Sequence, residues 1–158
     1  MEMEKIKILA QSPLPKVIHG INPRNIMGDK AWNKIKKEKQ TVANHHCMIC
    51  NEYVPHIPGN YLECHEVYDV DISNHIYELV DIVCICRKCH EYIHFGRLQM
   101  LLKEGKITYE YYQEIMDRGD NILSQYNLKK EIFDIKEINN TEWRLKYNGK
   151  FYSKDTQF

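Results

Sequence analysis

The chain has 158 residues, of which 43% are apolar and 28% charged, the size and composition of one ordinary globular domain. These proportions exclude a disordered or collagen-like chain, and no run approaches the roughly 18 apolar residues of a membrane-spanning helix. Residues 1–15 mix acids with lysines and contain no long apolar run. We therefore expect no signal peptide, no membrane partner and a cytoplasmic location.

The charges balance over the whole chain, with 22 Lys and Arg against 22 Asp and Glu, but they are unevenly distributed. Residues 1–46 carry nine basic and four acidic side chains, residues 47–96 carry two and eight, and residues 97–158 carry eleven and ten. The middle segment therefore has a net charge of −6, which does not favour binding to a polyanion.

The N-terminal part of the chain is predicted to be an arm followed by a basic helix. Residues 11–28 contain prolines and glycines and predict an extended arm with turns. Asp29 is predicted to cap a helix over residues 30–43. The lysines of this helix predict either a solvated face or a contact surface for nucleic acid; they are Lys30, Lys34, Lys36, Lys37 and Lys39.

The middle segment predicts two strands and a helix. Residues 61–70 (YLECHEVYDV) and 78–86 (ELVDIVCIC) alternate or run apolar, as strands do. A helix is predicted directly after them, in residues 89–96 (CHEYIHFG). The expected local order is strand, loop, strand, helix.

The last third predicts helices and a hairpin. Residues 96–105 predict a short helix ended by Gly105, Thr108 is predicted to cap a second helix that stops at Gly119, and a third stretch is predicted over 120–138. Asn148 and Gly149, between alternating apolar residues, predict a tight β-hairpin. Trp143, Leu145 and Tyr147 are expected to line one face of it.

All six cysteines fall between residues 47 and 89. In a reducing compartment such a cluster is typical of metal binding rather than of disulfides. Two C-x2-C pairs predict a closed, structural Zn2+ site with four thiolate ligands, Cys47, Cys50, Cys86 and Cys89. Cys84, on a predicted strand, is interpreted as a small buried hydrophobic residue.

A second group of metal-binding side chains lies between and just after these pairs. His90 and His94 have the i,i+4 spacing that puts both imidazoles on one face of a helix. Cys64 and His65 lie on the first predicted strand and Asp81 on the second.

Residues 62–67 (LECHEV) and 79–96 (LVDIVCICRKCHEYIHFG) resemble the HNH endonuclease superfamily, whose active site is a ββα-metal finger. The similarity is to the zinc-stapled branch and covers residues 47–96. It implies an α+β fold, in which an HNH-like finger over residues 45–96 is tied by the four-cysteine zinc site. An arm and basic helix (1–44) and a helical segment with a C-terminal β-hairpin (97–158) are expected to flank it within one compact domain.

The resemblance implies a role for each polar residue of the second group. His65 matches the general base that activates water, and His90 and His94 match metal ligands on the helix. Cys64 stands where the family has an Asp or His ligand, and Asp81 where it has the Asn that orients the base. Asp81 is expected to accept the Nδ1–H of His65 and to stabilise the imidazolium formed during catalysis.

A site of Cys64, His90 and His94 favours Zn2+, Ni2+ or Mn2+ over Mg2+, which prefers oxygen ligands. Alternatively, Cys64 faces the core and Glu63 or Glu66 supplies an oxygen ligand. A third interpretation is a second structural zinc, held by Cys64, His90 and His94 with His65 or Glu66 as fourth ligand.

Two functional hypotheses follow. The resemblance implies a metal-dependent DNA endonuclease, and the abundance of Lys, Ile and Asn is typical of bacterial or phage proteins. Its phosphate contacts are expected from Lys34, Lys37, Arg87, Lys88 and Arg97. The alternative is a non-catalytic zinc-binding module that binds a protein partner or nucleic acid, which the acidic middle segment favours.

Overall fold

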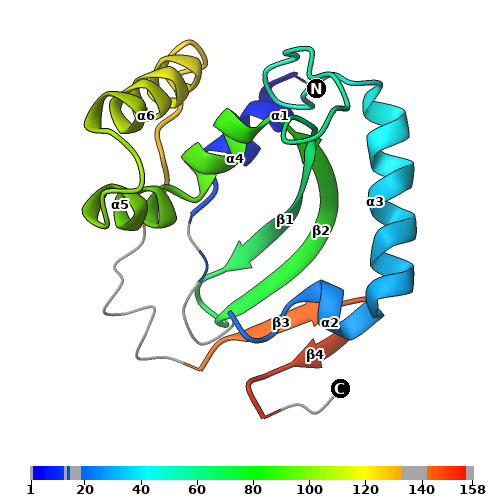
Figure 1. The fold of residues 1–158 in the computed structure, drawn as a ribbon. Helices are drawn as coiled ribbons and strands as arrows, with labels where there is room; N and C mark the ends of the chain where they lie inside the picture. The colour runs from blue at the N-terminus through cyan, green and yellow to red at the C-terminus, as the bar shows by residue number, and fades with distance from the viewer. Residues whose placement is uncertain (1, 13, 15–18, 133–141, 156–158) are drawn as a thin grey trace.

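The computed structural model describes residues 2–12, 14, 19–132 and 142–155. It is an α+β fold in which helices lie on both faces of a four-stranded sheet (Figure 1). The helices are α1 (Glu2–Leu9), α2 (Pro23–Met27), α3 (Asp29–Ala43), α4 (Arg87–Ile93), α5 (Phe95–Lys103) and α6 (Tyr109–Ser124). The strands are β1 (Glu63–Asp71), β2 (Ile76–Ile85), β3 (Arg144–Tyr147) and β4 (Lys150–Tyr152). Within the described residues, no helix has both the length and the apolarity to cross a membrane.

The sheet confirms the predicted strands and the predicted hairpin. β1 and β2 form an antiparallel pair in which His65 lies opposite Val83. β3 adds to β2 in parallel and β4 closes the far edge, so the order is β1-β2-β3-β4. Asn148 and Gly149 have φ angles of 48° and 74°, the left-handed conformations that a two-residue hairpin turn requires.

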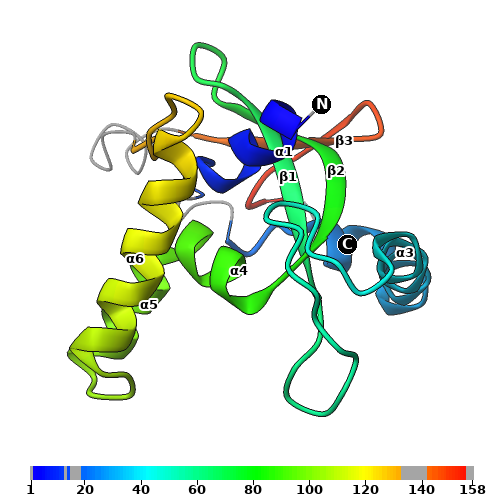
Figure 2. The same ribbon diagram turned by 90° about the horizontal axis from the view of Figure 1, so that it is seen from above.

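The β1–β2 hairpin separates two layers of helices. Figures 1 and 2 show α3 on one side of it and α4, α1, α5 and α6 on the other. Successive side chains of a strand point to opposite faces of its sheet. Along β1, Glu63 and His65 therefore face α4, whereas Cys64 faces α3.

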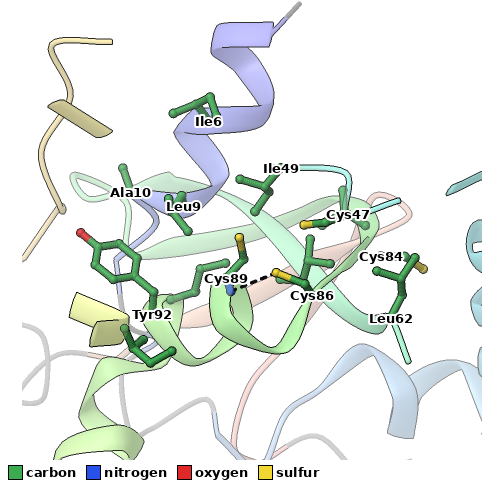
Figure 3. Packing of buried hydrophobic residues seen from close by; sticks show 14 of the residues in the cluster. Ile6, Leu9, Ala10, Cys47, Ile49, Leu62, Cys84, Cys86, Cys89 and Tyr92 are labelled. Carbon is green, nitrogen blue, oxygen red and sulfur yellow. Dashed lines mark hydrogen bonds between the residues drawn. The ribbon is translucent and has the colours of Figure 1, made fainter. Parts of the chain in front are cut away.

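The main hydrophobic core lies on the α4 side of the sheet and reaches the cysteine pairs (Figure 3). Its largest buried side chains include Leu9 of α1, Ile85 of β2, Tyr92 of α4 and Leu123 of α6. A second, smaller cluster lies beneath β3 and contains Ile21, Tyr77, Trp143 and Leu145. The C-terminal hairpin therefore extends the sheet and covers its own small core.

The chain after α6 is anchored in part by the half-buried Lys130. Lys130 Nζ donates to the carbonyls of Leu9 (3.1 Å) and Ile93 (3.2 Å), the last residues of α1 and α4. Its ammonium also lies 4.9 Å from the centre of the Tyr92 ring. Burial lowers the pKa of Lys130 to about 7. This side chain joins two helix ends immediately beside His94.

The N-terminal part of the chain differs from the prediction in three places. The predicted arm over residues 11–28 contains α2, which Asn22 caps by accepting from the Asn25 N–H, and Pro23 provides its first turn. α1 precedes it and was not predicted; burial of Ile6 and Leu9 in the main core stabilises this short helix. Asp29 is not an N-cap: it is the first residue of α3, and the cap position is Gly28.

The C-terminal helices were predicted in part. α5 and the cap of α6 are as expected, since Thr108 Oγ1 accepts from the Tyr111 N–H at 3.1 Å. However, α6 does not stop at Gly119 but continues to Ser124. No helix follows over residues 125–132, and the remainder of the predicted third helix, 133–138, lies outside the described residues.

Gly119 is required where α6 passes over Tyr92. A Cβ atom at this position would lie 2.1 Å from the Tyr92 ring. The ring cannot easily move, because its hydroxyl donates to Asp120 Oδ1 at 2.6 Å and the side chain is fully buried.

We expect Gly119→Ala to lower the free energy of unfolding by about 2 kcal/mol or more, because overpacking outweighs the helical preference of alanine. Gly96→Ala is the matched control: a Cβ there meets no atom within 4 Å, so stability should stay equal or rise by up to about 1 kcal/mol. Urea unfolding of both variants checks this. Equal stability of the two variants would contradict the packing described.

Candidate metal centres

The four-cysteine cluster predicted from the spacing is confirmed. The Sγ atoms of Cys47, Cys50, Cys86 and Cys89 all lie within 4.8 Å of one another. Cys50 Sγ and Cys86 Sγ are 3.8 Å apart. Two sulfurs on a tetrahedral zinc, at about 2.3 Å each, stand about 3.8 Å apart, so both the donor set and the spacing fit such an ion.

Local backbone structure places these thiols. After the first pair, Asn51 adopts a left-handed conformation (φ 60°), which asparagine tolerates, and its N–H donates to Cys47 O at 2.9 Å. In the second pair, Cys86 is the N-cap of α4, and its Sγ accepts from the Cys89 N–H (3.5 Å; Figure 3). The positive end of a helix stabilises a thiolate at this position.

Arg118 of α6 is a partner of this cluster that the sequence analysis missed. Its guanidinium donates to Cys50 Sγ at 3.1 Å and to Cys89 Sγ at 3.5 Å. Burial alone would lower the pKa of Arg118. The hydrogen bonds that Arg118 donates to Cys89 and Cys50, together with the negative charges of these cysteines, outweigh burial and raise the pKa. Four thiolates with one divalent cation carry a formal charge of −2, and Arg118 offsets half of it.

The second cluster consists of three histidines. His65 of β1, His90 of α4 and His94 at its C-terminal end bring one ring nitrogen each to within 4.8 Å of the others. His65 is 2% exposed, and its buried Nδ1 has no hydrogen-bond partner among the residues that the structure describes. Leaving a buried polar atom unpaired costs about 1–3 kcal/mol. A metal ion among the three rings would give a ring nitrogen of the buried His65 a partner, so the cluster fits such an ion.

The electrostatics of the cluster also suit metal binding. His90 Nδ1 donates to Glu63 Oε2 at 2.7 Å, which leaves its Nε2 for an ion, the usual arrangement of a ligand histidine held by a carboxylate. This hydrogen bond lowers the pKa of Glu63. Burial and the neighbouring histidines lower the pKa of His65 well below its usual range and that of His94 to about 4. Neutral imidazoles are the form that binds metals.

The histidine cluster borders a cleft of about 280 Å³. Arg87 and Arg97 line it together with Glu63, His90 and His94. Arg87 is held in place, since its Nη2 donates to Gly59 O at 2.9 Å. The site thus combines three imidazoles with two guanidinium groups, a set that can hold a cation and an anionic ligand next to each other.

The prediction that Cys64 ligates the second metal with His90 and His94 was wrong. Because strand residues alternate, Cys64 points away from His65, towards α3. Its Sγ lies 3.0 Å from Cys84 Sγ and 3.9 Å from the carbonyl of Lys36. The alternative in which Cys64 lies away from the site agrees with this placement. That alternative also makes Glu63 or Glu66 an oxygen ligand, but Glu63 instead accepts a hydrogen bond from His90 and is not a member of the three-histidine cluster.

The prediction that Asp81 orients His65 was also wrong. Asp81 pairs with Val67 in the ladder and accepts from Lys39 Nζ of α3 at 2.7 Å. Near His65, the structure instead places the Gln11 side chain, whose Nε2 lies 3.4 Å from His65 Nε2. Gln11 comes from the predicted arm, which carried no sequence signal for this role.

The five predicted nucleic-acid contacts do not form one surface. Arg87 and Arg97 line the cleft, but Lys34 and Lys37 lie on α3, across the sheet from it. Lys88 donates to Glu114 of α6 at 2.9 Å.

Comparisons with protein-family models, with curated proteins and with solved structures found no match.

We expect removal of the metal with a strong chelator to abolish cooperative unfolding of the chain. The cluster joins residue 47 to residue 89, and zinc binding in small modules contributes about 10–16 kcal/mol, as much as the total stability of a typical domain. Circular dichroism melts with measured zinc content check this. Cys50→Ser should behave like the chelated protein, whereas Cys64→Ser should retain zinc; an unchanged melt after metal loss would contradict the structural role.

Arg118→Ala should weaken zinc retention by about 10- to 100-fold in competition with a chromophoric chelator, as loss of an outer partner of a metal site does. Arg118→Lys keeps the positive charge, and its zinc retention should lie between that of Arg118→Ala and that of the wild type. Lys88→Ala removes a basic residue that contacts only Glu114 among the described hydrogen bonds, and should leave retention unchanged. Equal zinc retention in Arg118→Ala and Lys88→Ala would show that Arg118 does not compensate the negative charge of the four-cysteine site.

Proposed function

We propose that this chain is a metal-dependent endonuclease that hydrolyses phosphodiester bonds in DNA, of the HNH type that its middle segment resembles. The observation that carries the proposal is the three-histidine cluster, with its unpartnered buried nitrogen, at the edge of a cleft that contains two arginines. A site that is only structural needs neither an adjoining cleft nor anion-binding groups.

The frame of the site supports the same proposal. One histidine comes from the first strand of an antiparallel hairpin and two from the helix that follows the second strand. The four-cysteine cluster ties the start of that helix to the loop before the hairpin. This is the arrangement expected of a zinc-stapled ββα-metal finger.

The residues of the cleft can each take a separate role in hydrolysis. A divalent ion held by three neutral imidazoles would supply positive charge to the phosphoryl oxygens and lower the pKa of an attacking water. Arg87 and Arg97 would bind the non-bridging oxygens of the phosphate and fix its orientation. Glu63 would keep the ring of His90 oriented through the bond to its Nδ1.

The geometry favours a ligand role for His65 over the predicted role of general base. A base must reach the attacking water, but His65 is 2% exposed and its unpaired Nδ1 is buried. The general-base role stays a prediction, and the count of bound metal ions separates the two roles.

The acidity of residues 47–96 opposes DNA binding less than the net charge suggests. Four of its acids already lie against basic side chains, each within 4.0 Å: Glu52 with Arg118, Glu63 with Arg87, Glu78 with Lys146, and Asp81 with Lys39. The cleft itself is lined by two arginines and by two glutamates, Glu63 and Glu91, so its side chains carry no net formal charge, against −6 for the segment as a whole.

Cleavage of supercoiled plasmid in Mg2+, Mn2+, Ni2+ and Zn2+ tests the proposal. We expect the wild type to cut, and His65→Ala and His94→Ala to lose activity by about 100-fold or more. His56→Ala removes an exposed histidine outside both clusters and should cut like the wild type.

Metal content measured on the same samples assigns the roles. Two ions per wild-type chain and one in His65→Ala support a ligand role; two ions in an inactive His65→Ala would assign it as the base. No cutting in any metal, by protein with its four-cysteine site filled, would refute the nuclease and leave the non-catalytic binding module.

A further inference from the structure

Two cysteines lie outside both metal clusters and face each other across the β1–β2 hairpin. Cys64 and Cys84 are directly opposite in the antiparallel ladder. Their Sγ atoms are 3.0 Å apart. Both are free thiols in the structure, and neither belongs to a cluster of metal-binding side chains in the described part of the chain.

The separation of these sulfurs differs from that of a metal-bound pair. Two thiolates on one tetrahedral zinc stand about 3.8 Å apart, the distance found between Cys50 and Cys86. At 3.0 Å, Cys64 and Cys84 are too close to share such an ion. They need to approach by only about 1 Å to reach the length of a disulfide, about 2.05 Å.

The backbone already allows this bond. Directly opposed residues of antiparallel strands have Cα atoms about 4.5–5.5 Å apart, within the disulfide range of about 4.4–6.8 Å. The two strands therefore need no rearrangement for the sulfurs to join.

The two thiols differ in access. Cys84 is 0% exposed, and its backbone is held by a hydrogen bond from the Met48 N–H to its carbonyl at 3.0 Å. Cys64 is partly exposed beneath the backbone of α3. A reagent from solution therefore reaches Cys64 first, and Cys84 is the thiol placed to react next.

We propose that Cys64 and Cys84 are a redox-active pair, which a low-molecular-weight disulfide such as oxidised glutathione converts into a bridge between β1 and β2. The Cys64 thiolate attacks one sulfur of the glutathione disulfide, forms a mixed disulfide and releases one glutathione thiolate. The Cys84 thiol then loses its proton and attacks the Cys64 sulfur, which forms the Cys64–Cys84 bond and releases the second glutathione thiolate. The protein loses two electrons and two protons, and the oxidant becomes two molecules of glutathione.

Each cysteine of the pair is close in the chain to a member of one of the two clusters. Cys64 directly precedes His65, and Cys84 is two residues from Cys86. Oxidation would therefore link the strand of the histidine cluster covalently to the strand that enters the four-cysteine cluster. The proposal does not depend on nuclease activity.

Treatment of zinc-loaded full-length protein with oxidised glutathione tests the pair. We expect the intact mass to fall by two hydrogen atoms, peptide mapping to show a Cys64–Cys84 link, and zinc content to stay constant. The proposal is overturned if both thiols remain free, or if cysteines of the zinc cluster react first with release of the ion.

Two variants test the order of reaction. In Cys84→Ala, Cys64 should keep glutathione as a stable mixed disulfide, because its partner is missing. In Cys64→Ala, Cys84 should remain unmodified, because it is buried. Retained zinc shows that each variant is folded; a free Cys64 in the first variant or a modified Cys84 in the second contradicts the assignment.

Discussion

The clustering of four thiols at the start of α4 is the constraint on which the rest of the structure depends. It joins the loop after α3 to the end of β2, and Cys86 serves both as a member of the cluster and as the N-cap of α4. The cap sets where the helix begins, and so which residues face β1. His90 and His94 meet His65 because the helix starts at Arg87 and not one residue later. Arg118 extends the same constraint to α6, and the buried ring of Tyr92 packs that helix closely at Gly119.

The alternation of β1 divides the chemistry of the hairpin between two faces. Glu63 and His65 face α4 and line or border the cleft, whereas Cys64 faces α3 and meets Cys84. One strand thus supplies an imidazole to one side of the sheet and a thiol to the other. A shift of the strand by one residue would exchange the two and would remove His65 from the histidine cluster.

Much of this arrangement could be predicted from local patterns. The C-x2-C spacing gave the four-cysteine cluster, apolar alternation gave β1 and β2, and Asn148-Gly149 gave the hairpin. The failures came from tertiary packing. α1 is stabilised by burial of Ile6 and Leu9 rather than by a strong helix signal, and Gly119 acts as a contact point in a helix rather than as its end. Arg118 and Gln11 reach the two clusters from distant parts of the chain, with no local motif.

The error on Cys64 has a different cause. The resemblance assigned adjacent residues, Cys64 and His65, to the same site. Alternation within a strand makes this difficult when the partner helix covers only one face. The i,i+4 spacing of His90 and His94 was sufficient to place the helix, and the period of the strand then selects His65 as the third member of the cluster. The hairpin's member of the histidine cluster was therefore predictable to within one residue.

We propose that the three histidines form a second metal site beside the four-cysteine site. Anomalous diffraction at the zinc edge, from crystals of the protein grown with Zn2+, tests it most directly. We expect two peaks per chain, one surrounded by the sulfurs of Cys47, Cys50, Cys86 and Cys89 and one by the nitrogens of His65, His90 and His94. A single peak at the four cysteines, with His65 Nδ1 hydrogen-bonded to a protein atom or a water, would contradict it.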